Sequence, residues 1–381
     1  MFMLGRSIPV LILGRIFQGL SGSLVWTVGL ALLTDTVRKD RIGQAMGYVT
    51  ASFSAGALCG PLLGGVVYSS AGYYAVFAMG FALIILDIIM RIFIVEKAVA
   101  AQWSVEDDLD VLGRPSTTPG STRLSTATEE VQPPSPVDSQ YPSEKLKPIT
   151  TYQVPTCLGF KLPPMILLLR IPRLLVSLLG CFAQSAAIAA FDGVLPAYVK
   201  ETFNWNSTGA GLIFFTLVVP TLTSPFFGHL SDRYGSRYLT AFGFTVTIPF
   251  WVCLRFVTSN TMGHKVLLCV LLSGIGFGLT MGIVPLMAEI DHVVALEEKK
   301  RPGSLGKKGG AAQGYALFNA AFAIGAVVGP LWSGFIIENS GFGTVGWSIS
   351  IMCAVAAVAT FCWTGGRILS KEKDSYGVEL V

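Results

Sequence analysis

The chain has 381 residues, of which 52% are hydrophobic and 13% are charged, and its mean hydropathy is +0.62. A soluble domain usually carries about a quarter charged residues, so this balance excludes an ordinary soluble protein and indicates an integral membrane protein. The formal net charge of +4 is small and scattered, which argues against a nucleic-acid partner. The seven dispersed cysteines show neither metal-ligand spacing nor a disulfide framework, and we expect no cofactor.

Nine stretches of the chain are apolar and long enough, at about 20 residues, to form transmembrane helices. Short loops join most of them, so the sequence predicts an all-α membrane fold. Residues 1–7 have the composition of the end of a further helix. The nine predicted spans cover approximately residues 9–33, 44–69, 73–95, 173–199, 208–230, 238–257, 265–287, 312–337 and 345–366.

The segment between the third and fourth spans divides the chain. Residues 96–171 are rich in Pro, Ser and Thr and contain an acidic run, so they cannot bury enough apolar surface to become ordered. We expect a disordered cytosolic linker, with a regulatory phosphorylation region as the alternative. The linker separates residues 1–95, with three spans, from residues 172–367, with six spans, and a tail at residues 368–381 follows.

Basic residues indicate on which side of the membrane each loop lies. Arg38, Lys39 and Arg41 follow the first predicted span, whereas the next loop, residues 69–72, has no basic residue. The alternation continues along the chain and places the linker and the C-terminus in the cytosol. The sequence leaves open whether the membrane is the plasma membrane or a vacuolar or vesicular one.

A glycine-rich stretch occurs twice, and both copies lie within predicted spans. Residues 56–65 reappear 269 positions later as residues 325–334, and the match continues at the same offset into Ala71-Gly72-Tyr73 and Ser340-Gly341-Phe342. A repeat at this distance in a membrane chain is typical of a transporter with two related halves. The residues that define the two copies are Gly56, Gly60, Pro61, Gly64 and Gly65 in the first and Gly325, Gly329, Pro330 and Gly334 in the second.

The spacing of these residues gives each copy two physical properties. Gly56, Gly60 and Gly64 lie four residues apart, so they form a smooth stripe that lets a neighbouring helix backbone approach closely. Pro61 has no N–H group and leaves the carbonyl of Ala57 without its helical partner, which bends the helix. Ordinary glycine packing is the alternative, but two copies at one offset favour a transporter.

A polar motif at residues 228–237 follows the fifth predicted span. It begins at Gly228, which ends the span tightly, and contains Gly235. Within it, Asp232 lies beside Arg233 and Arg237. We expect the Asp232 carboxylate to pair with these arginines and to favour a nearby helix N-terminus. The alternative is a surface ion cluster that contributes little energy.

Asp192 is the candidate for proton coupling or substrate binding. It lies within the fourth predicted span, four residues before Pro196. An ionised carboxylate in the bilayer costs about 2.5–3.5 kcal/mol, so such a residue usually faces a cavity or a partner. Desolvation favours the neutral form of a carboxyl group, which lets it exchange protons near neutral pH. The alternative is a static hydrogen bond with an interior side chain such as Gln184 or Ser185.

Other charged residues lie within or beside the spans. Asp87 and Arg91 are four residues apart near the end of the third span, so we expect a local salt bridge. Arg15 is a cation within the first span, and Asp291 is expected to end the seventh span.

Four motifs together resemble the major facilitator superfamily of transporters, of the drug:proton antiporter type, and within it the vesicular amine transporters and their fungal relatives. Residues 15–19 resemble the fourth-helix motif and residues 56–65 the fifth-helix antiporter motif. Residues 228–237 resemble the loop motif between helices eight and nine, and residues 191–196 resemble the acidic seventh-helix segment of the amine transporters. The family fold has twelve helices in two six-helix halves. The resemblance implies that this chain supplies helices four to twelve, through truncation or an incomplete gene model.

The resemblance also implies roles for individual residues. The loop motif around Asp232 is similar to one that latches helices in one state of the transport cycle, although Ser236 stands where a basic residue is more usual. Arg15 is linked to proton transfer and would hydrogen-bond toward helix one. Asp87 resembles an acidic residue with a part in gating. Asn319 stands where the amine transporters have an acid in helix eleven, which argues against monoamines as substrates.

These observations predict a secondary active transporter. We expect a proton-coupled antiporter that exports or sequesters small amphipathic or cationic organic molecules, with protons, a small-molecule substrate and the lipid bilayer as its partners. Aromatic residues such as Phe191 and Trp251 are candidates for lining an apolar cavity, with core packing as the alternative. A truncated, non-transporting relative or a substrate-sensing membrane protein is the other class. An enzyme is not expected, because no nucleophile–base set, nucleotide loop or metal cluster is visible.

Overall fold

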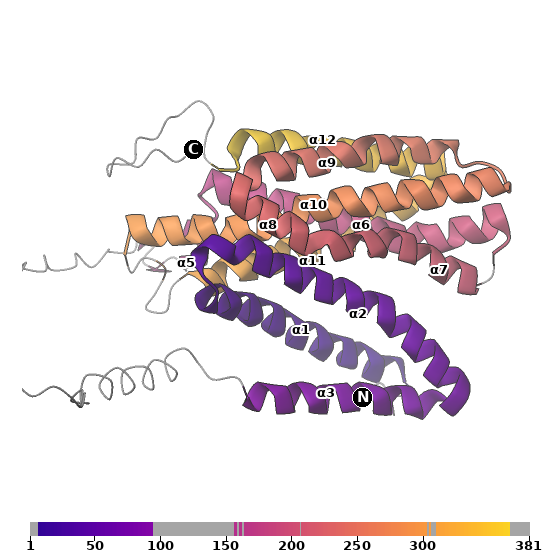
Figure 1. Ribbon diagram of the computed structural model, residues 1–381, viewed down its shortest axis with the longest axis horizontal. Coiled ribbons are helices and arrows are strands. Elements are labelled where there is room, and N and C mark those ends of the chain that lie inside the picture. The colour runs from indigo at the N-terminus through magenta and orange to yellow at the C-terminus, as the bar shows by residue number, and fades with distance from the viewer. Residues whose placement is uncertain are drawn as a thin grey trace, which may run out of the picture. The chain divides into compact units, whose positions relative to one another are not determined.

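The computed structural model describes residues 7–93, 156–157, 160–161, 164–205, 207–302, 305 and 310–365. The chain falls into two compact units, one made of Met1–Val76 with Tyr152–Val381 and the other of Phe77–Thr151. The first unit holds almost all of the described helices (Figure 1). Most of helix α3 (Tyr73–Ile92) belongs to the second unit.

Long apolar helices dominate the first unit. Near the start of the chain, α1 (Ile8–Thr36) and α2 (Ile42–Ala71) are joined by the short 3-10 turn η1 (Lys39–Arg41). The C-terminal part consists of α6 (Pro172–Phe203), α7 (Ser207–Val218), η2 (Val219–Thr223), α8 (Ser224–Tyr234), α9 (Ser236–Cys253), η3 (Leu254–Phe256), α10 (Met262–Lys300), α11 (Ala311–Ser340) and α12 (Phe342–Trp363).

The nine predicted spans are confirmed within the described residues. Each corresponds to a helical segment with the length and hydropathy needed to cross a membrane. One of them, Gly211–Tyr234, runs from α7 through η2 into α8, and Pro220 lies in its 3-10 part. The largest difference concerns α10, which continues to Lys300. Asp291 therefore lies inside this helix, and the prediction that it ends the helix is wrong.

The internal repeat is visible as two helices of equal length. α2 and α11 each have 30 residues, and both of their ends are displaced by the same 269 positions. Each helix ends at a single glycine, Gly72 or Gly341, with a φ of 82° or 79°, and the next helix begins one residue later. Glycine adopts this left-handed backbone without the steric cost of a Cβ. One residue therefore suffices for the turn in both copies.

Part of the predicted linker is ordered. Helix α5 (Pro164–Leu168) packs against α11, and Leu168 is fully buried. Before it, β1 (Thr156–Cys157) pairs antiparallel with β2 (Phe160–Lys161). The prediction of disorder is wrong for residues 164–171, because their apolar side chains find a partner. The predictions for residues 96–155 and for the tail at 368–381 lie outside the described residues.

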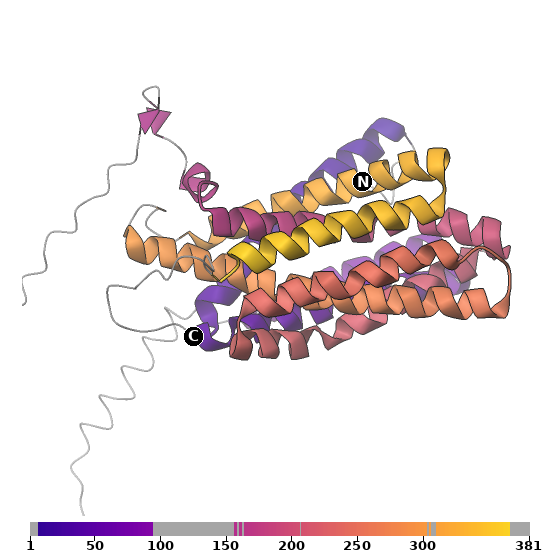
Figure 2. The same ribbon diagram turned by 90° about the horizontal axis from the view of Figure 1, so that it is seen from above.

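The buried core lies in the C-terminal part. α6 packs along α11, and α9 packs along α10 and α12 (Figure 2). Trp251 and Phe244 on α9 and Tyr315 on α11 are among the largest fully buried side chains. In the most hydrophobic window of α6, 72% of the residues are buried, against 11% in α1. The described helices therefore surround α6 and leave most of α1 uncovered.

Candidate functional site

α2 and α8 cross with their backbones almost in contact (Figure 1). A Cβ on Gly228 of α8 would lie 2.1 Å from the carbonyl oxygen of Gly43 in α2, and a Cβ on Gly47 would lie 2.5 Å from the carbonyl oxygen of Ser224. The Ser224 hydroxyl donates a hydrogen bond to the Gly47 carbonyl oxygen at 2.8 Å. Glycine is needed here because any side chain would push the two backbones apart. We call this contact the α2–α8 crossing.

At the α2–α8 crossing, the Asp232 side chain of α8 binds the first turn of α2. Its Oδ1 accepts a hydrogen bond from the Gly43 N–H at 2.7 Å, and its Oδ2 accepts one from the Gln44 N–H at 2.8 Å. The first N–H groups of a helix have no partner within the helix, and the helix dipole favours a negative charge beside them. Asp232 thus caps one helix from another, which confirms the expected helix N-terminus.

The two arginines of the loop motif have other partners. The Arg233 guanidinium lies 5.6 Å from the ring centre of Tyr234, and the Arg237 Nε donates to the Thr364 carbonyl oxygen at 2.5 Å. Within the described residues Asp232 forms no ion pair with either arginine, so that part of the prediction is wrong. Gly235, with a φ of 85°, makes the turn from α8 into α9, whereas Gly228 lies inside α8, so the prediction that Gly228 ends the span is wrong.

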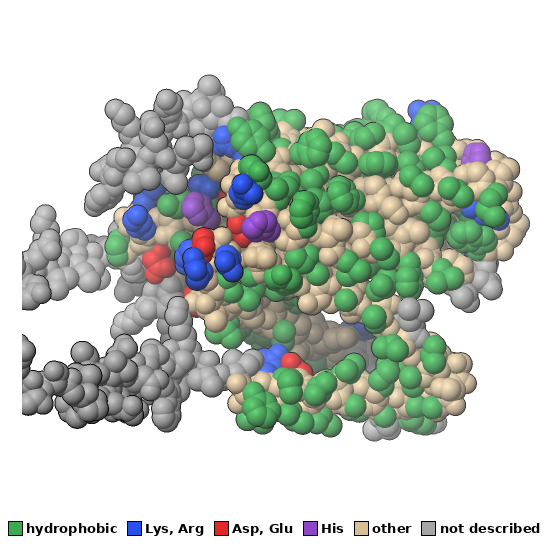
Figure 3. All heavy atoms as spheres, viewed as in Figure 1, with side chains coloured by type: hydrophobic (Ala, Val, Ile, Leu, Met, Phe, Trp, Pro, Cys, Tyr) green, Lys and Arg blue, Asp and Glu red, His purple; other side chains and the backbone are tan. Residues whose placement is uncertain are grey.

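A second link holds the start of α2 to the C-terminal part. The Lys39 Nζ in η1, directly before α2, lies 3.2 Å from the Asp291 Oδ2 in α10. The Asp291 side chain is only 4% exposed, whereas that of Lys39 is 66% exposed. The exposed Lys39 ammonium group therefore compensates the negative charge of the buried Asp291 carboxylate. Figure 3 shows one group of charged and histidine side chains on this face near the place where α8 meets α2.

Glu289 is a buried carboxylate within α10 that joins the ends of three other helices. One of its oxygens accepts hydrogen bonds from the Arg173 Nε, at the start of α6, and from the Gly365 N–H, just after α12, the latter at 2.9 Å. The other oxygen accepts a bond from the Ser236 hydroxyl, at the start of α9, at 2.5 Å. A buried charge needs a partner and hydrogen bonds to be tolerated. The Arg173–Glu289 cluster supplies both.

Sequence reasoning missed the Arg173–Glu289 cluster. Arg173 lies 116 residues before Glu289 along the chain, so no local spacing reveals the pair. One signal was present, because Glu289 lies two residues after the predicted span at residues 265–287, close enough to the membrane interior for an acid to need a partner. The unusual Ser236 of the loop motif also finds its explanation here, since its hydroxyl binds Glu289 while Arg173 carries the positive charge.

Asp192 lies in α6 with an exposed side chain. Within the described part of the chain it has no hydrogen bond or ion pair. The neighbouring Gly193 faces α11, since a Cβ there would lie 3.2 Å from the Pro330 Cβ. The alternative of a static bond to Gln184 or Ser185 is wrong, because Ser185 donates to the Phe322 carbonyl and the Gln184 Oε1 is buried without a partner among the described residues.

The remaining predicted site residues are spread over other helices. The Arg15 Nη1 donates to the Gln18 Oε1, one turn along α1, at 3.0 Å. Asp87 and Arg91 form the expected local salt bridge at 2.8 Å, and both side chains are about 60% exposed. Asn319 in α11 is half-buried. The structure therefore brings the loop motif and α2 together but does not gather all the candidates in one place.

The two copies of the glycine-rich stretch have different surroundings. In the second copy, a Cβ on Gly325 would lie 2.5 Å from the Phe182 carbonyl oxygen, and a Cβ on Gly329 would lie 2.4 Å from that of Ala186. The predicted close approach of a neighbouring backbone is thus present, and that backbone is α6. In the first copy, no described atom lies within 4 Å of a Cβ built on any of its four glycines, Gly56, Gly60, Gly64 and Gly65.

The aromatic residues considered for a cavity belong to the core. Phe191 stacks on Trp251 with ring centres 4.4 Å apart. Phe191 is 2% exposed and Trp251 is 0% exposed. Their positions fit the alternative of core packing, and the cavity interpretation is wrong for this pair.

The comparisons with known proteins agree with this architecture. The family model of the Major Facilitator Superfamily matches residues 1–298. The MFS-type transporter ppzB of Metarhizium rileyi is 27% identical over 377 residues, which cover 96% of this chain and 77% of the relative. An uncharacterized MFS-type transporter of Schizosaccharomyces pombe is 31% identical over 365 residues, which cover 94% of this chain and 75% of the relative.

An animal relative is more distant. The synaptic vesicular amine transporter of Bos taurus is 25% identical over 345 residues, which cover 90% of this chain and 53% of the relative. The fungal and animal relatives are all named as transporters.

Proposed function

The chain belongs to the major facilitator superfamily, a family of transporters rather than enzymes, and from that premise we propose that this secondary transporter is a proton-coupled antiporter. Its cargo is a small amphipathic or cationic organic molecule, which it exports or sequesters by alternating access. In this proposal Asp192 carries the coupling proton. The main supporting observation is that its side chain is exposed within a spanning helix and has no partner among the described residues.

The chemistry of Asp192 supports this role. An ionisable side chain inside a membrane span is costly unless it faces a cavity or a pathway, so its retention suggests a use. A carboxyl group that loses its proton gains a negative charge that attracts a cation. Proton release and binding of a cationic substrate can therefore alternate at one residue. Asp192 is also placed beside the α6–α11 contact, where Gly193 meets Pro330.

The α2–α8 crossing is the proposed gate. Asp232 and the Lys39–Asp291 pair both bind the start of α2 to the C-terminal part, so they stabilise one closed end of the molecule. Figure 1 supports this, since α2 lies against α8 at that end and diverges from α7 toward the other. Opening requires these contacts to break. The Arg173–Glu289 cluster positions Ser236, directly after the Gly235 turn, and the Thr364 carbonyl oxygen holds the next residue, Arg237.

The proposals for the membrane orientation of the chain and for the class of substrate depend on the sequence. Basic residues such as Lys39 at this end support a cytosolic position for the gate, the linker and the C-terminus. The membrane is a plasma membrane or a vacuolar or vesicular one. Asn319 supplies an amide without a charge, which favours amphipathic cargo over monoamines.

Transport by membrane vesicles tests the proposal. Vesicles that contain the full chain are given an imposed pH gradient and a panel of fluorescent or radiolabelled organic cations and amphipathic drugs. We expect Asp192→Asn to reduce gradient-driven uptake at least tenfold, because an amide cannot release a proton. The matched control is Glu201→Gln, which removes another exposed acid from the same helix and should leave uptake unchanged.

The same assay separates coupling from transport itself. With no pH gradient, Asp192→Asn should still exchange labelled for unlabelled uncharged amphipathic substrate, because that cargo does not need the carboxylate charge. Unchanged gradient-driven uptake by Asp192→Asn would refute its coupling role. Saturable substrate binding without any uptake by the unaltered chain would instead favour a substrate-sensing protein.

A further inference from the structure

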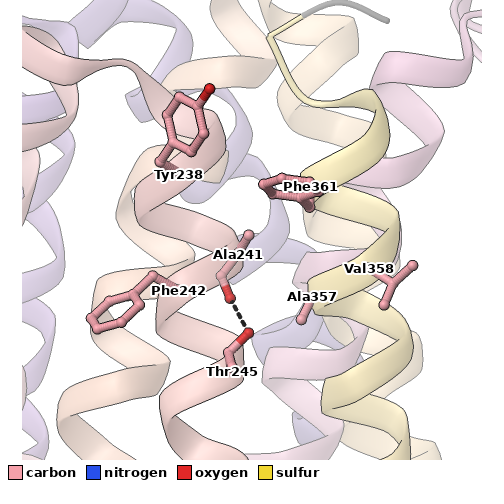
Figure 4. A pocket seen from close by; sticks show the side chains of 7 residues that line it. All are labelled: Tyr238, Ala241, Phe242, Thr245, Ala357, Val358 and Phe361. Carbon is pink, nitrogen blue, oxygen red and sulfur yellow. Dashed lines mark hydrogen bonds between the residues drawn. The ribbon is translucent and has the colours of Figure 1, made fainter. Parts of the chain in front are cut away.

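An apolar groove lies between α9 and α12. Its volume is about 600 Å³, and Figure 4 shows its lining side chains rising from both helices. The lining consists of Tyr238, Ala241, Phe242, Thr245, Ala357, Val358 and Phe361. Phe242 and Val358 are 61% and 64% exposed, so the groove opens on the outer surface of the described helices.

The walls of the groove have almost no hydrogen-bonding groups that a polar ligand could use. The Thr245 hydroxyl donates to the Ala241 carbonyl oxygen at 2.7 Å, so it is already bonded within α9 (Figure 4). The Tyr238 and Phe361 rings meet edge to face, with centres 6.3 Å apart, and close one end. Such a surface suits a hydrocarbon chain, because both are apolar and no hydrogen bond is lost.

A positive charge lies at one end of the groove. Arg237 precedes Tyr238 in the first turn of α9, and its Nε donates to the carbonyl oxygen of Thr364, directly after α12. The guanidinium therefore bridges the ends of the two helices that form the groove. The Tyr238 hydroxyl lies at the same end and has no hydrogen-bond partner within the described part of the chain.

The length of the groove fits part of one leaflet. Tyr238 and Thr245 are two turns apart, which corresponds to about 10 Å along α9. One leaflet contributes about 15 Å of hydrocarbon. An occupant that starts at the charged end thus lies within the leaflet on the side where α9 begins.

We propose that this groove binds an anionic phospholipid, with one acyl chain against Phe242 and Val358 and the headgroup phosphate at Arg237 and the Tyr238 hydroxyl. The charge decides between lipids, because a guanidinium attracts a headgroup with a net negative charge, such as that of phosphatidylserine, more strongly than a zwitterionic phosphatidylcholine headgroup. A transported molecule is a poorer occupant, because the groove lies within one half and away from the α2–α8 crossing.

Native mass spectrometry of the full chain tests the proposal. The detergent-solubilised protein is mixed with phosphatidylserine or phosphatidylcholine that carry the same acyl chains. We expect at least fivefold greater retention of phosphatidylserine. Val358→Trp fills the groove and should reduce this retention to the phosphatidylcholine level. Val355→Trp is the matched control, since Val355 lies one turn away on α12, is 54% exposed and does not line the groove.

Several outcomes would overturn the proposal. Equal retention of the two lipids would remove the role of Arg237, and equal loss in both tryptophan variants would remove the role of the groove. Displacement of phosphatidylserine by transported drugs would make the groove a substrate site instead. If Val358→Trp does not fold, Phe361→Ala against Phe335→Ala makes the same comparison, since Phe335 is exposed on α11 outside the groove. The proposal then requires that only Phe361→Ala lowers phosphatidylserine retention.

Discussion

α2 and α11 share a sequence motif, a length and a terminal glycine, yet within the described residues only α11 uses the glycines of the shared motif for packing. Gly325 and Gly329 let the α6 backbone approach to within a distance that no Cβ allows, whereas nothing in the described part of the chain approaches Gly56 or Gly60 so closely. The difference shows that a small-residue stripe permits a close contact without creating one. The helix that lies opposite decides whether the stripe is used.

Charged side chains also differ between the C-terminal part and the helices that precede it. The C-terminal part buries Glu289 among three hydrogen-bond donors, with a side chain 4% exposed. The described charge pair of α3, Asp87 with Arg91, lies at the surface. Three pairs of matched substitutions test this contrast between the C-terminal part and the helices that precede it.

The largest effect is expected at Glu289. Glu289→Gln removes the charge that compensates Arg173, and breaking a buried pair costs about 3–5 kcal/mol. Asp87→Asn breaks an exposed pair, which contributes about 0–1 kcal/mol. Thermal unfolding in detergent, followed by tryptophan fluorescence, should show a large drop in apparent Tm for Glu289→Gln alone. Similar drops for both variants would contradict the contrast.

The next effect compares equivalent glycines of the repeat. Gly329→Ala places a Cβ 2.4 Å from the Ala186 carbonyl oxygen, so α11 and α6 must separate, at a cost of about 1–3 kcal/mol. Gly60→Ala meets open space in the described structure and should stabilise its helix by about 0.5–1 kcal/mol. The two apparent Tm values should therefore move in opposite directions. A loss at Gly60 equal to that at Gly329 would show that another backbone packs against the first copy.

The smallest effect is expected at the α2–α8 crossing. Asp232→Ala removes the cap on α2, which is worth about 1 kcal/mol, so the ratio of open to closed molecules should rise about fivefold. Spin labels at Tyr48 and Phe226, which are exposed on α2 and α8, report this as a longer distance in pulsed electron resonance. Glu338→Ala is the control, since Glu338 is an exposed acid in the last turn of α11. An unchanged distance distribution for Asp232→Ala would remove Asp232 from the gate.

The sequence predicted those features that depend on local pattern. Apolar length located the nine spans, and the fixed offset of the repeat located the equal helices α2 and α11 with their turns at Gly72 and Gly341. Each of these features follows from residues that are near one another in the chain or from an identical copy.

The sequence could not predict contacts that depend on which helices become neighbours. Lys39 and Asp291 are 252 residues apart, and their pair became visible only when η1 was seen beside α10. The sequence around Phe191 and Trp251 fits a cavity lining and core packing equally well. The position of α9 against α6 decides in favour of core packing. The partner of Asp232 was misjudged for the same reason, since its adjacent arginines seemed closer than an amide 188 residues away.

The backbone contact at the α2–α8 crossing has a consequence for the speed of opening. Side chains that interlock must change rotamer before two helices can separate, and each ordered side chain carries an entropic cost. Gly43, Gly47 and Gly228 have no rotamers, so the backbone contact at these three positions separates and closes again without any change of rotamer there. Besides a few hydrogen bonds and the Lys39–Asp291 ion pair, opening is resisted by the buried Met46 side chain of α2, which must leave its apolar neighbours.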